Sequence, residues 1–376
     1  MWYNLFVQIK TLELTNFRNY SSARLNLDGG LNVLIGKNAQ GKTNLLESIY
    51  FAGLGHSART PREKELIKWE TALARVKAAL LRRDGERSIE MILPNSGKKT
   101  VKINNLPIKR LGELMGELPL VYFSPDELRL VKEAPSDRRR FLDIDISQLS
   151  KVYFYSLQRY NKILAQRNAL LKQKKDKVTT KQTISIWNEA LAKNGANVIL
   201  ARLQFLNELK IQAAKIHAKL TNNKEKLEIF YSGLVGGAAG ELVEKLQAAY
   251  VKSFEKDYEL GFTTVGPHRD DLILKVNGAD IRAYGSQGQQ RTAALSLKLA
   301  ELEIFKAQYG EYPVLLLDDV LSELDETRAN QLLKAINGIQ TILTCTSFNY
   351  KVDYPYKLFT IEGGKIAKQE TKQNGY

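Results

Sequence analysis

The sequence between residues 36 and 43 reads Gly36-Lys37-Asn38-Ala39-Gln40-Gly41-Lys42-Thr43. It matches the phosphate-binding loop pattern G-x-x-x-x-G-K-[ST] at every fixed position. The apolar segment Leu31–Ile35 before it is typical of a buried strand, and Asn44–Ala52 after it is typical of a helix. Because the pattern lies at a strand-to-helix turn, as it should, we expect an α/β fold built around this loop.

Each residue type in the loop suits phosphate binding. Gly36 and Gly41 allow a curled backbone whose N–H groups face a phosphate chain. Lys42 can reach the β- and γ-phosphates, and the Thr43 hydroxyl can ligate Mg²⁺. The N-terminus of the following helix adds its dipole. The loop therefore predicts a nucleoside triphosphate bound with Mg²⁺, and the flanking strand and helix argue against a chance glycine-rich turn.

The composition indicates a globular protein. The chain has 376 residues, 44% of them hydrophobic and 26% charged, which is enough apolar material for more than one core. Its single cysteine, Cys345, rules out an intramolecular disulfide framework and suits a reducing cytoplasm. We see neither a secretory leader nor a run of about 18 apolar residues, so we expect a cytoplasmic protein with no membrane segment.

The charge is strongly basic and unevenly distributed. The formal net charge is +15, a balance that indicates nucleic acid or another anionic partner. Residues 148–226 carry 16 Lys plus Arg and 4 Asp plus Glu, hence 16 − 4 = +12. Most of the excess lies in about a fifth of the chain, which favours a polyanion-facing element over a generally solubilising surface.

The same basic segment has a helical pattern. It contains no proline and little glycine, and apolar residues recur on both sides of a polar turn at 172–181. They are Tyr153, Leu157, Tyr160 and Leu164 before the turn, and Ile184, Leu191, Val198 and Phe205 after it. The companion positions Asn188, Gly195 and Arg202 are polar or small. We interpret the segment as an antiparallel helical hairpin, an arm; the alternative is an ordinary helix pair in a core.

The strand patterns fall on either side of this arm. Residues 73–109 read as an antiparallel layer inserted after the first helix, and Leu120–Phe123 reads as a further strand. Beyond the arm, Phe262–Val265 and Asp271–Val276 read as strands, and Gln289–Gln308 as a long helix.

A second part of a nucleotide site lies near residue 318. The apolar strand Val314–Leu317 ends in Asp318 and Asp319. A carboxylate at this place can hold Mg²⁺ opposite Thr43. We assign that role to Asp318, and the orientation of the attacking water to Asp319; the alternative is an acidic strand end that caps the next helix.

A further anion site precedes the long helix. Its residues are Ser286, Gln287, Gly288, Gln289 and Gln290. A serine hydroxyl and a glycine N–H at a helix N-terminus can bind an anion. Because the chain already has a phosphate loop for its own nucleotide, we expect this site to bind the γ-phosphate of a nucleotide held by another subunit.

The order of these pieces resembles the ATP-binding-cassette (ABC) head of the SMC class of chromosome proteins, and within it the RecF family of bacterial recombination and gap-repair proteins. The resemblance covers essentially the whole chain. It is carried by residues 16–20 (Asn-Phe-Arg-Asn-Tyr), 40–47 (Gln-Gly-Lys-Thr-Asn-Leu-Leu-Glu), 139–143 (Arg-Arg-Phe-Leu-Asp), 266–271 (Gly-Pro-His-Arg-Asp-Asp) and 286–290. It implies that Ser286–Gln290 is the signature motif. It also implies that Ser322–Asp325 is the D-loop, with Asp325 at a dimer seam.

The resemblance also implies a function. Residues 1–125 and 261–376 would form a P-loop ABC-type ATPase head with an antiparallel β layer, and 126–260 an inserted helical arm. Two copies would close around two ATP molecules with Mg²⁺ and bind single-stranded, duplex or gapped DNA. A RecR-type recombination mediator would be the protein partner.

Several positions depart from the general cassette pattern. The signature reads Ser-Gln-Gly-Gln, and Asp319 stands where many cassettes have Glu. Thr346 or Ser347 stands where many have His, and no Gln closely follows Leu120–Phe123, where Asp126 or Glu127 could serve instead. A shorter base and a missing His predict slow hydrolysis, a timed switch.

Three other functions fit a phosphate loop: a P-loop kinase, an ATP-dependent nuclease and a transporter's cassette subunit. Smaller features have paired interpretations too. Arg59 and Arg62 could touch nucleotide or DNA, or only solvate a loop. Arg138–Arg140 could grip phosphates, or Arg139 or Arg140 could pair with Asp143. His268 could line the nucleotide or dimer surface, or be a hydrogen-bonded turn residue.

Overall fold

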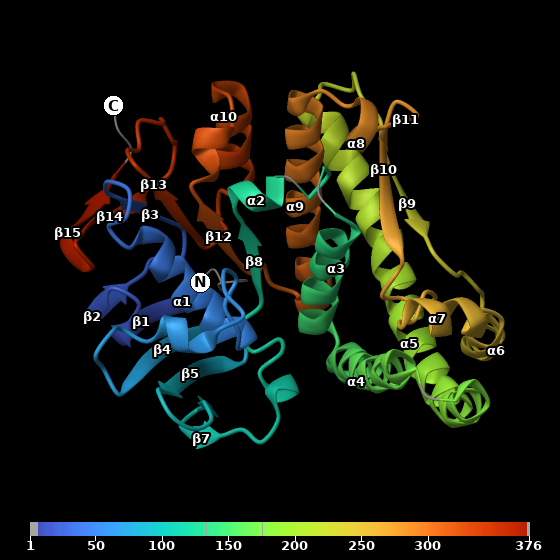
Figure 1. Ribbon diagram of the computed structural model, residues 1–376. Helices are drawn as coiled ribbons and strands as arrows, with labels where there is room; N and C mark the ends of the chain where they lie inside the picture. The colour runs from blue at the N-terminus through green and yellow to red at the C-terminus, as the bar shows by residue number, and fades with distance from the viewer. Residues whose placement is uncertain (1–6, 129, 133, 175, 374–376) are drawn as a thin grey trace. The chain divides into compact units, whose positions relative to one another are not determined.

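The computed structural model describes residues 7–128, 130–132, 134–174 and 176–373, and the chain forms two compact units (Figure 1). The first unit contains residues 1–129, 219–222 and 291–376, and the second contains 130–218 and 223–290. The second unit extends to Gln290, further than the arm expected at 126–260, because the strand after the arm pairs with the strand that starts at Asp271.

The first unit contains a mostly parallel sheet, with strand order β15-β14-β3-β13-β12-β8. Every neighbouring pair is parallel except β14 and β15. Its strands are β3 (Leu31–Ile35), β8 (Leu120–Phe123), β12 (Val314–Asp318), β13 (Thr341–Cys345), β14 (Tyr356–Glu362) and β15 (Lys365–Lys372). Every residue of β12 and β13 is buried, as expected for parallel strands covered on both faces.

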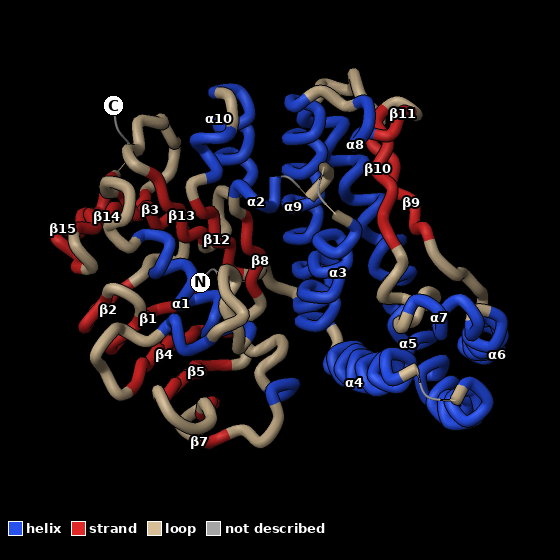
Figure 2. Tube along the Cα trace, in the orientation of Figure 1, coloured by secondary structure: helices blue, strands red, loops and turns tan. Residues whose placement is uncertain are grey.

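A second, antiparallel sheet lies in the same unit, in the order β2-β1-β4-β5-β6-β7. Its strands are β1 (Gln8–Phe17), β2 (Tyr20–Asn26), β4 (Leu73–Arg82), β5 (Gly85–Pro94), β6 (Thr100–Ile103) and β7 (Leu106–Pro107). Both sheets of the first unit appear red in Figure 2. The expected antiparallel layer after the first helix is confirmed, and it also takes in the two N-terminal strands.

Helix α1 (Lys42–Leu54) contacts strands of both sheets. From Leu45 to Leu54 it is buried all round, because sheets cover it on more than one side. The shorter helices of this unit are η1 (Glu63–Leu66), η2 (Leu111–Glu113), α2 (Pro125–Leu128), η3 (Val320–Glu323) and α10 (Glu326–Ala335).

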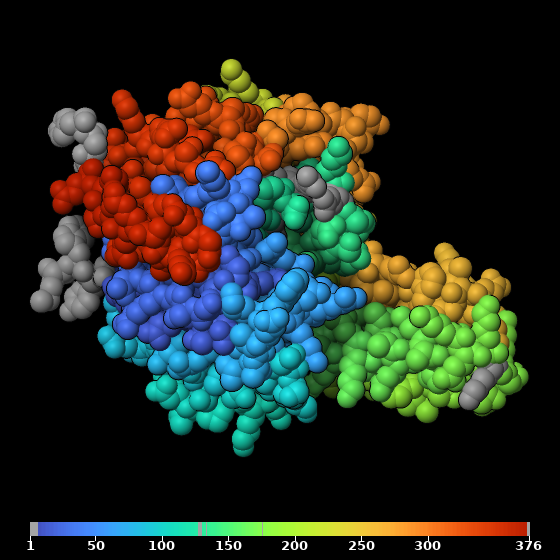
Figure 3. Space-filling model, turned by 60° about the vertical axis from the view of Figure 1, so that its left-hand side comes forward, coloured from blue at the N-terminus to red at the C-terminus, as the bar shows by residue number. Residues whose placement is uncertain are grey.

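The two ends of the described chain meet in the first unit. Strand β14 pairs with β3, and β15 contacts β2. Figure 3 shows the result, with the red C-terminal segment lying against the blue N-terminal one. The parallel sheet is therefore built from segments that are far apart in the sequence.

The second unit is mainly helical (Figure 2). Its elements are α3 (Pro135–Leu149), α4 (Lys151–Gln173), α5 (Lys177–Leu220), β9 (Leu227–Ser232), α6 (Ala239–Lys252), α7 (Phe254–Leu260), β10 (Asp271–Val276), β11 (Ala279–Asp280) and α8 (Ile281–Tyr284). Helix α9 (Gln287–Tyr309) begins in this unit and continues into the first. No described helix has both the length and the apolar character needed to cross a bilayer.

The expected arm corresponds to α4 and α5, which pack into a core of the second unit. That core consists of Tyr160, Leu191, Ala192, Ala196, Ile199, Leu242, Leu246 and Tyr250. Helices α4 and α5 are thus part of a packed unit, because α6 covers their apolar residues.

Packing also explains the polar companion positions of α5. A Cβ on Gly195 would lie 3.2 Å from both Leu246 and Tyr160, so glycine allows close helix contact. Arg202 is 2% exposed, and its guanidinium donates to Asp143 Oδ1 at 2.7 Å and to Pro267 O at 2.7 Å. The heptad pattern breaks at Gly195 because the helices pack closely there, and at Arg202 because a buried side chain makes hydrogen bonds in place of apolar contacts.

The strand expected at Phe262–Val265 is absent, since these residues form a loop. Thr264 donates its N–H to Asp257 at 2.9 Å, and Thr263 donates its N–H to Asn168 at 2.8 Å. Side-chain oxygens therefore accept the backbone N–H groups that would otherwise donate to a neighbouring strand.

Candidate nucleotide site

Residues 36–43 connect β3 to α1, as the sequence pattern requires. Gly41 has φ +113°, and a Cβ there would lie 2.7 Å from the Asn19 amide and 2.9 Å from the Tyr20 hydroxyl. Gly36 approaches the carbonyl oxygen of Ile361, which a Cβ would meet at 2.3 Å. Both glycines are needed, because no other residue would fit the backbone at these points.

Two segments that are distant in the sequence form hydrogen bonds with the loop. Asn19 Nδ2 donates to Gln40 O at 3.1 Å, and the Tyr20 hydroxyl donates to Gly41 O at 3.0 Å. From the turn between β14 and β15, Gly364 N–H donates to Gln40 O at 3.0 Å, and Gly363 N–H to Gln40 Oε1 at 2.6 Å. The curl of the loop is thus fixed before any ligand binds.

The Lys42 ammonium lies inside the curl of the loop. Its Nζ donates to Gly36 O at 2.5 Å and to Lys37 O at 2.9 Å, and the residue is 8% exposed. The exposed rim consists of Lys37, Asn38 and Ala39. A phosphate at this point would meet a cation already held at the centre of the curl.

The structure brings Thr43 and Asp318 together. Thr43 Oγ1 donates to Asp318 Oδ1 at 2.9 Å, although the two residues are 275 positions apart. Asp318 Oδ1 also accepts from Thr344 Oγ1 at 2.8 Å, and Asp318 Oδ2 accepts from the Tyr122 hydroxyl at 3.1 Å. A carboxylate beside a hydroxyl is an all-oxygen donor set of the kind that Mg²⁺ prefers, so these residues fit that ion.

Asp319 directly follows the strand and has φ +52°. Its N–H donates to Thr344 Oγ1 at 2.9 Å, and its side chain makes no capping hydrogen bond to η3. Burial, with a further contribution from the neighbouring charge of Asp318, raises the pKa of Asp319. A carboxylate with a raised pKa suits a group that accepts a proton from water.

Two residues at this end of the site were missed by the sequence reasoning, Thr344 and Tyr122. Both lie on strands that neighbour β12: Thr344 is the register partner of Asp318, and Tyr122 is the partner of Leu316. Equivalent positions on adjacent parallel strands meet at one edge of a sheet, and this rule could have placed both residues beside Asp318. It can be applied only when the order of the strands in the sheet is known.

The residues proposed as substitutes for the missing cassette His and Gln lie at different places. Thr346 and Ser347 line an open cavity of about 860 Å³ that also has Asp319 and Cys345 in its wall. Asp126 is exposed on α2. The side chain of Glu127 lies outside the described part of the chain.

The proposed signature residues start α9 in the second unit. Ser286 N–H donates to Gln289 Oε1 at 3.0 Å, and Gln289 N–H donates to Ser286 Oγ at 3.2 Å, so the pair caps the helix reciprocally. Gln289 Nε2 donates to Glu225 at 2.9 Å, while Gln290 Nε2 donates to Gly285 O at 3.1 Å. Ser286 and Gln287 are exposed.

The proposed D-loop, Ser322–Asp325, covers the last two residues of η3 and the two residues that lead into α10. Asp325 caps α10 by accepting the N–H of Arg328 at 2.9 Å, and this hydrogen bond lowers the pKa of Asp325. Glu323 accepts from Arg291 at 2.8 Å. Asp325 is exposed, as a residue at a seam between copies would be.

Other candidate residues have structural partners. Arg138 makes a bidentate pair with Asp271, at 2.7 and 2.9 Å, and Arg139 donates to Asp270 O at 2.8 Å. Asp143, which one of the two interpretations paired with Arg139 or Arg140, forms an ion pair with the buried Arg202.

His268 and two of the arm tyrosines are also held in the interior. His268 Nδ1 lies 2.6 Å from the Tyr160 hydroxyl, and its Nε2 lies 3.0 Å from Thr263 O. Burial lowers the pKa of His268 to about 4. Tyr153 and Tyr160 are buried, so both contribute to the interior of the second unit.

The comparisons with known proteins agree with this geometry. Residues 8–354 match the family model for the RecF/RecN/SMC N terminal domain. The DNA replication and repair protein RecF of Clostridium tetani (strain Massachusetts / E88) is 45% identical over 366 residues, which cover 96% of this chain and 99% of the relative.

Solved structures give the same result. One, described as the recombination mediator protein RecF-ATPrS in the RecFOR pathway, superposes with a TM-score of 0.90 at 40% identity, over 96% of this chain and 97% of the other. Another, the same mediator as RecF-ATP, gives a TM-score of 0.88 at 39% identity, over 99% of both chains.

Proposed function

The chain belongs to the RecF family, and from that premise we propose that it is an ATP-gated DNA-binding protein that acts in recombinational repair and replication restart at DNA gaps. The observation that carries the proposal is the meeting of Thr43 with Asp318 beside a preformed phosphate loop. That arrangement supports a bound triphosphate, and two RecF relatives are described with ATP or ATPrS.

In this proposal, backbone N–H groups of residues 36–43 hold the phosphates of ATP, and Lys42 neutralises the β- and γ-phosphates. Thr43 and Asp318 would hold Mg²⁺, which when bound neutralises charge on the phosphate oxygens. The hydroxyls of Thr344 and Tyr122 keep the Asp318 carboxylate oriented. Asp319 orients a water molecule and accepts its proton.

The proposed active form is a homodimer that contains two ATP molecules. The start of α9, residues 286–290, of which Ser286 and Gln287 are exposed, binds the γ-phosphate of the nucleotide held by the other copy. Asp325 lies at the seam between the copies. ATP binding joins the two chains, and hydrolysis releases them.

Hydrolysis is proposed to be slow. Aspartate is shorter than the glutamate of many cassettes, so Asp319 reaches less far toward a water molecule. The raised pKa of Asp319 partly offsets this, because it makes the carboxylate a better base. ATPase activity then acts as a timed switch.

The proposed partners are DNA and a RecR-type recombination mediator. Exposed lysines and arginines of α4 and α5 supply the basic surface for single-stranded, duplex or gapped DNA. The relatives' naming as DNA replication and repair proteins does not favour the nuclease alternative. A cytoplasmic location follows from this role, and the single cysteine suits it.

The experiment is sedimentation of the protein with and without ATP. Lys42→Met should abolish both ATP binding and ATP-driven dimers. Ser286→Arg should keep nucleotide binding by the monomer but block the dimer. If Ser286→Arg loses ATP binding outright, or if the unmodified protein stays monomeric at saturating ATP with DNA present, the two-copy site is refuted.

DNA binding has a separate test. Phosphate contacts should make log affinity fall with log salt by about 0.9 per contact for duplex DNA. A flat salt response would exclude the basic arm as the DNA surface. Cleavage of labelled DNA in Mg²⁺ and ATP would instead support a nuclease.

A further inference from the structure

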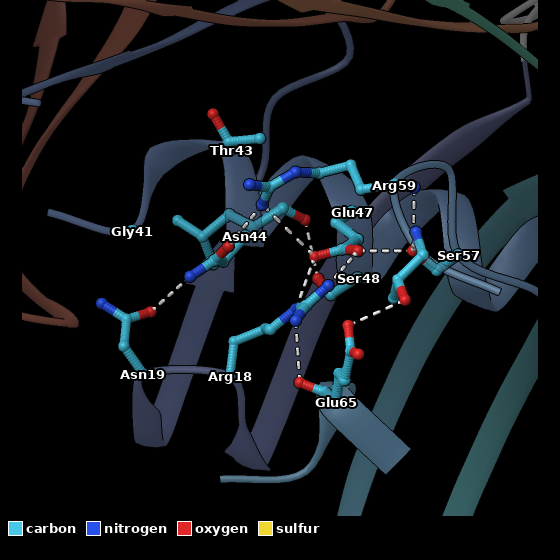
Figure 4. Close-up of polar contacts among 12 residues, drawn as sticks. Arg18, Asn19, Gly41, Thr43, Asn44, Glu47, Ser48, Ser57, Arg59 and Glu65 are labelled. Carbon is cyan, nitrogen blue, oxygen red and sulfur yellow. Dashed lines mark hydrogen bonds and ion pairs between the residues drawn. The ribbon is translucent and has the colours of Figure 1, made fainter. Parts of the chain in front are cut away.

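A buried carboxylate on α1 joins a cluster of polar groups that the proposed function does not use (Figure 4). Glu47 lies one helical turn beyond Thr43 and is 1% exposed. Arg18 forms a bidentate pair with it, at 2.9 Å from Nε and 2.8 Å from Nη2. Ser57 Oγ donates to the same carboxylate at 2.5 Å, and Arg59 Nη1 lies 3.7 Å from it.

Arg59 connects this cluster to the phosphate loop. Its Nη1 donates to Asn44 Oδ1 at 3.1 Å, and Asn44 is the residue after Thr43. Asn44 Nδ2 donates in turn to Asn19 Oδ1 at 2.9 Å, and Asn19 donates to Gln40 O at 3.1 Å. Figure 4 shows the Arg59 guanidinium lying beside Asn44 at the start of α1.

The backbone that carries Arg59 is anchored to the same carboxylate. Ser57 Oγ, while donating to Glu47, accepts the N–H groups of Arg59 at 2.9 Å and of Thr60 at 3.0 Å. Glu47 therefore fixes both ends of the arginine, its backbone through Ser57 and its guanidinium by charge. The same carboxylate therefore faces two guanidinium groups, those of Arg18 and Arg59.

Arg59 still faces open space. Its side chain is 49% exposed, and it lines a cavity of about 460 Å³ together with Arg18, Asn19 and Asn44. A guanidinium has five N–H donors in a planar fork that suits phosphate oxygens. Arg62, in the same loop, provides the contrast: its side chain is 83% exposed, and it approaches Glu65 only to 4.0 Å.

We propose that Glu47 is a positioning residue, which holds Arg59 so that its guanidinium contacts a phosphate of the nucleotide bound by the same chain. This inference rests on the proposed function and adds a cation to its phosphate site. The nucleotide is favoured over DNA because Arg59 is tied to Asn44, beside the Thr43 of the loop, whereas a DNA contact would need no such anchor.

The test is a double-mutant cycle with Glu47→Gln and Arg59→Ala, in which the dissociation constant of ATP is measured by calorimetry. Each single variant should weaken ATP binding about tenfold, the usual size for one charge-assisted hydrogen bond. The double variant should be no weaker than Arg59→Ala, because Glu47 acts through that arginine. Glu63→Gln is the matched control: it removes a carboxylate of the same loop that pairs with Lys99, and should leave ATP binding unchanged.

Three results would overturn the inference. Glu47→Gln could weaken ATP binding equally with and without the Arg59 side chain, which would indicate a purely structural carboxylate. Arg59→Ala could leave ATP binding intact and weaken DNA binding, which would make it a DNA contact. The third result is that ATP binding is unchanged in both single variants while Lys42→Met abolishes it; the proposed function then stands and only the inference fails.

A further variant covers the case in which Glu47→Gln does not fold. Ser57→Ala keeps the carboxylate but removes the hydroxyl that links it to the backbone of Arg59. Ser57→Ala should weaken ATP binding when Arg59 is present and should have no further effect in the Arg59→Ala variant. An equal loss of ATP binding in both cases would count against the inference.

Discussion

Replacing His268 or Asp270 should change the pH dependence of the second unit's stability in opposite directions. Both side chains lie in the loop that precedes β10, and burial shifts both pKa values toward the neutral form. The pKa of His268 falls from 6.5 to about 4, and the pKa of Asp270 rises from 3.8 to about 6. The neutral imidazole lies against the Tyr160 hydroxyl and Thr263 O, while Asp270 accepts from the Tyr231 hydroxyl.

The sizes follow from linkage, at 1.36 kcal/mol per pKa unit. For His268 the unfolded state binds more protons between pH 6.5 and 4, so this group removes about 3 kcal/mol of stability as the pH falls through that window. For Asp270 the folded state binds more protons between pH 6 and 3.8, so this group adds about 3 kcal/mol as the pH falls. In the unmodified chain the two effects nearly cancel.

The assay is urea unfolding at pH values from 7 to 4, followed by the fluorescence of Trp187. This tryptophan reports the second unit once Trp2 and Trp69, which belong to the first, are replaced by phenylalanine. Relative to the unmodified chain, His268→Asn should gain stability as the pH falls, and Asp270→Asn should lose it. If both differences are flat, or if they move in the same direction, the burial argument is refuted.

Other predictions concern the first unit. Thr344→Val removes a hydroxyl donor to Asp318, and should lower ATP turnover about tenfold, with a raised Mg²⁺ requirement, in a coupled ATPase assay. Gly41→Ala places a Cβ 2.7 Å from Asn19, and should cost about 1–3 kcal/mol in urea unfolding and abolish ATP binding. Cys345 is buried and its pKa is raised to about 12, so iodoacetamide at pH 8 should label it only after unfolding, as mass spectrometry would show.

The sequence predicted those parts that depend on local spacing. Three such parts follow from fixed intervals or from alternation along one segment. They are the turn at residues 36–43, the long helix before the strand that ends in Asp318, and the inserted antiparallel layer. The sequence also placed Asp318 opposite Thr43, because a carboxylate at the end of that strand can hold Mg²⁺ together with the threonine hydroxyl.

The parts that were missed depend on which strands or helices become neighbours. Thr344 and Tyr122 reach Asp318 only through the strand order β13-β12-β8, which no local pattern contains. Arg202 was counted in the basic charge of the arm and named as a polar companion position, but it is buried, and Asp143 and Pro267 O accept its hydrogen bonds. Phe262–Val265 was predicted as a strand, but the hydroxyls of Thr263 and Thr264 donate to Asn168 and Asp257 in a loop.

The contact between the β14–β15 turn and the phosphate loop has a consequence for biosynthesis. A ribosome makes residues 36–43 early, whereas Asp318 comes 275 residues after Thr43, and Thr344 and the Gly363-Gly364 turn come later still. A partly made chain thus has the loop without its acidic neighbour or its rear support. Until translation has passed Gly364, the loop lacks the two hydrogen bonds that the Gly363 and Gly364 N–H groups donate to Gln40.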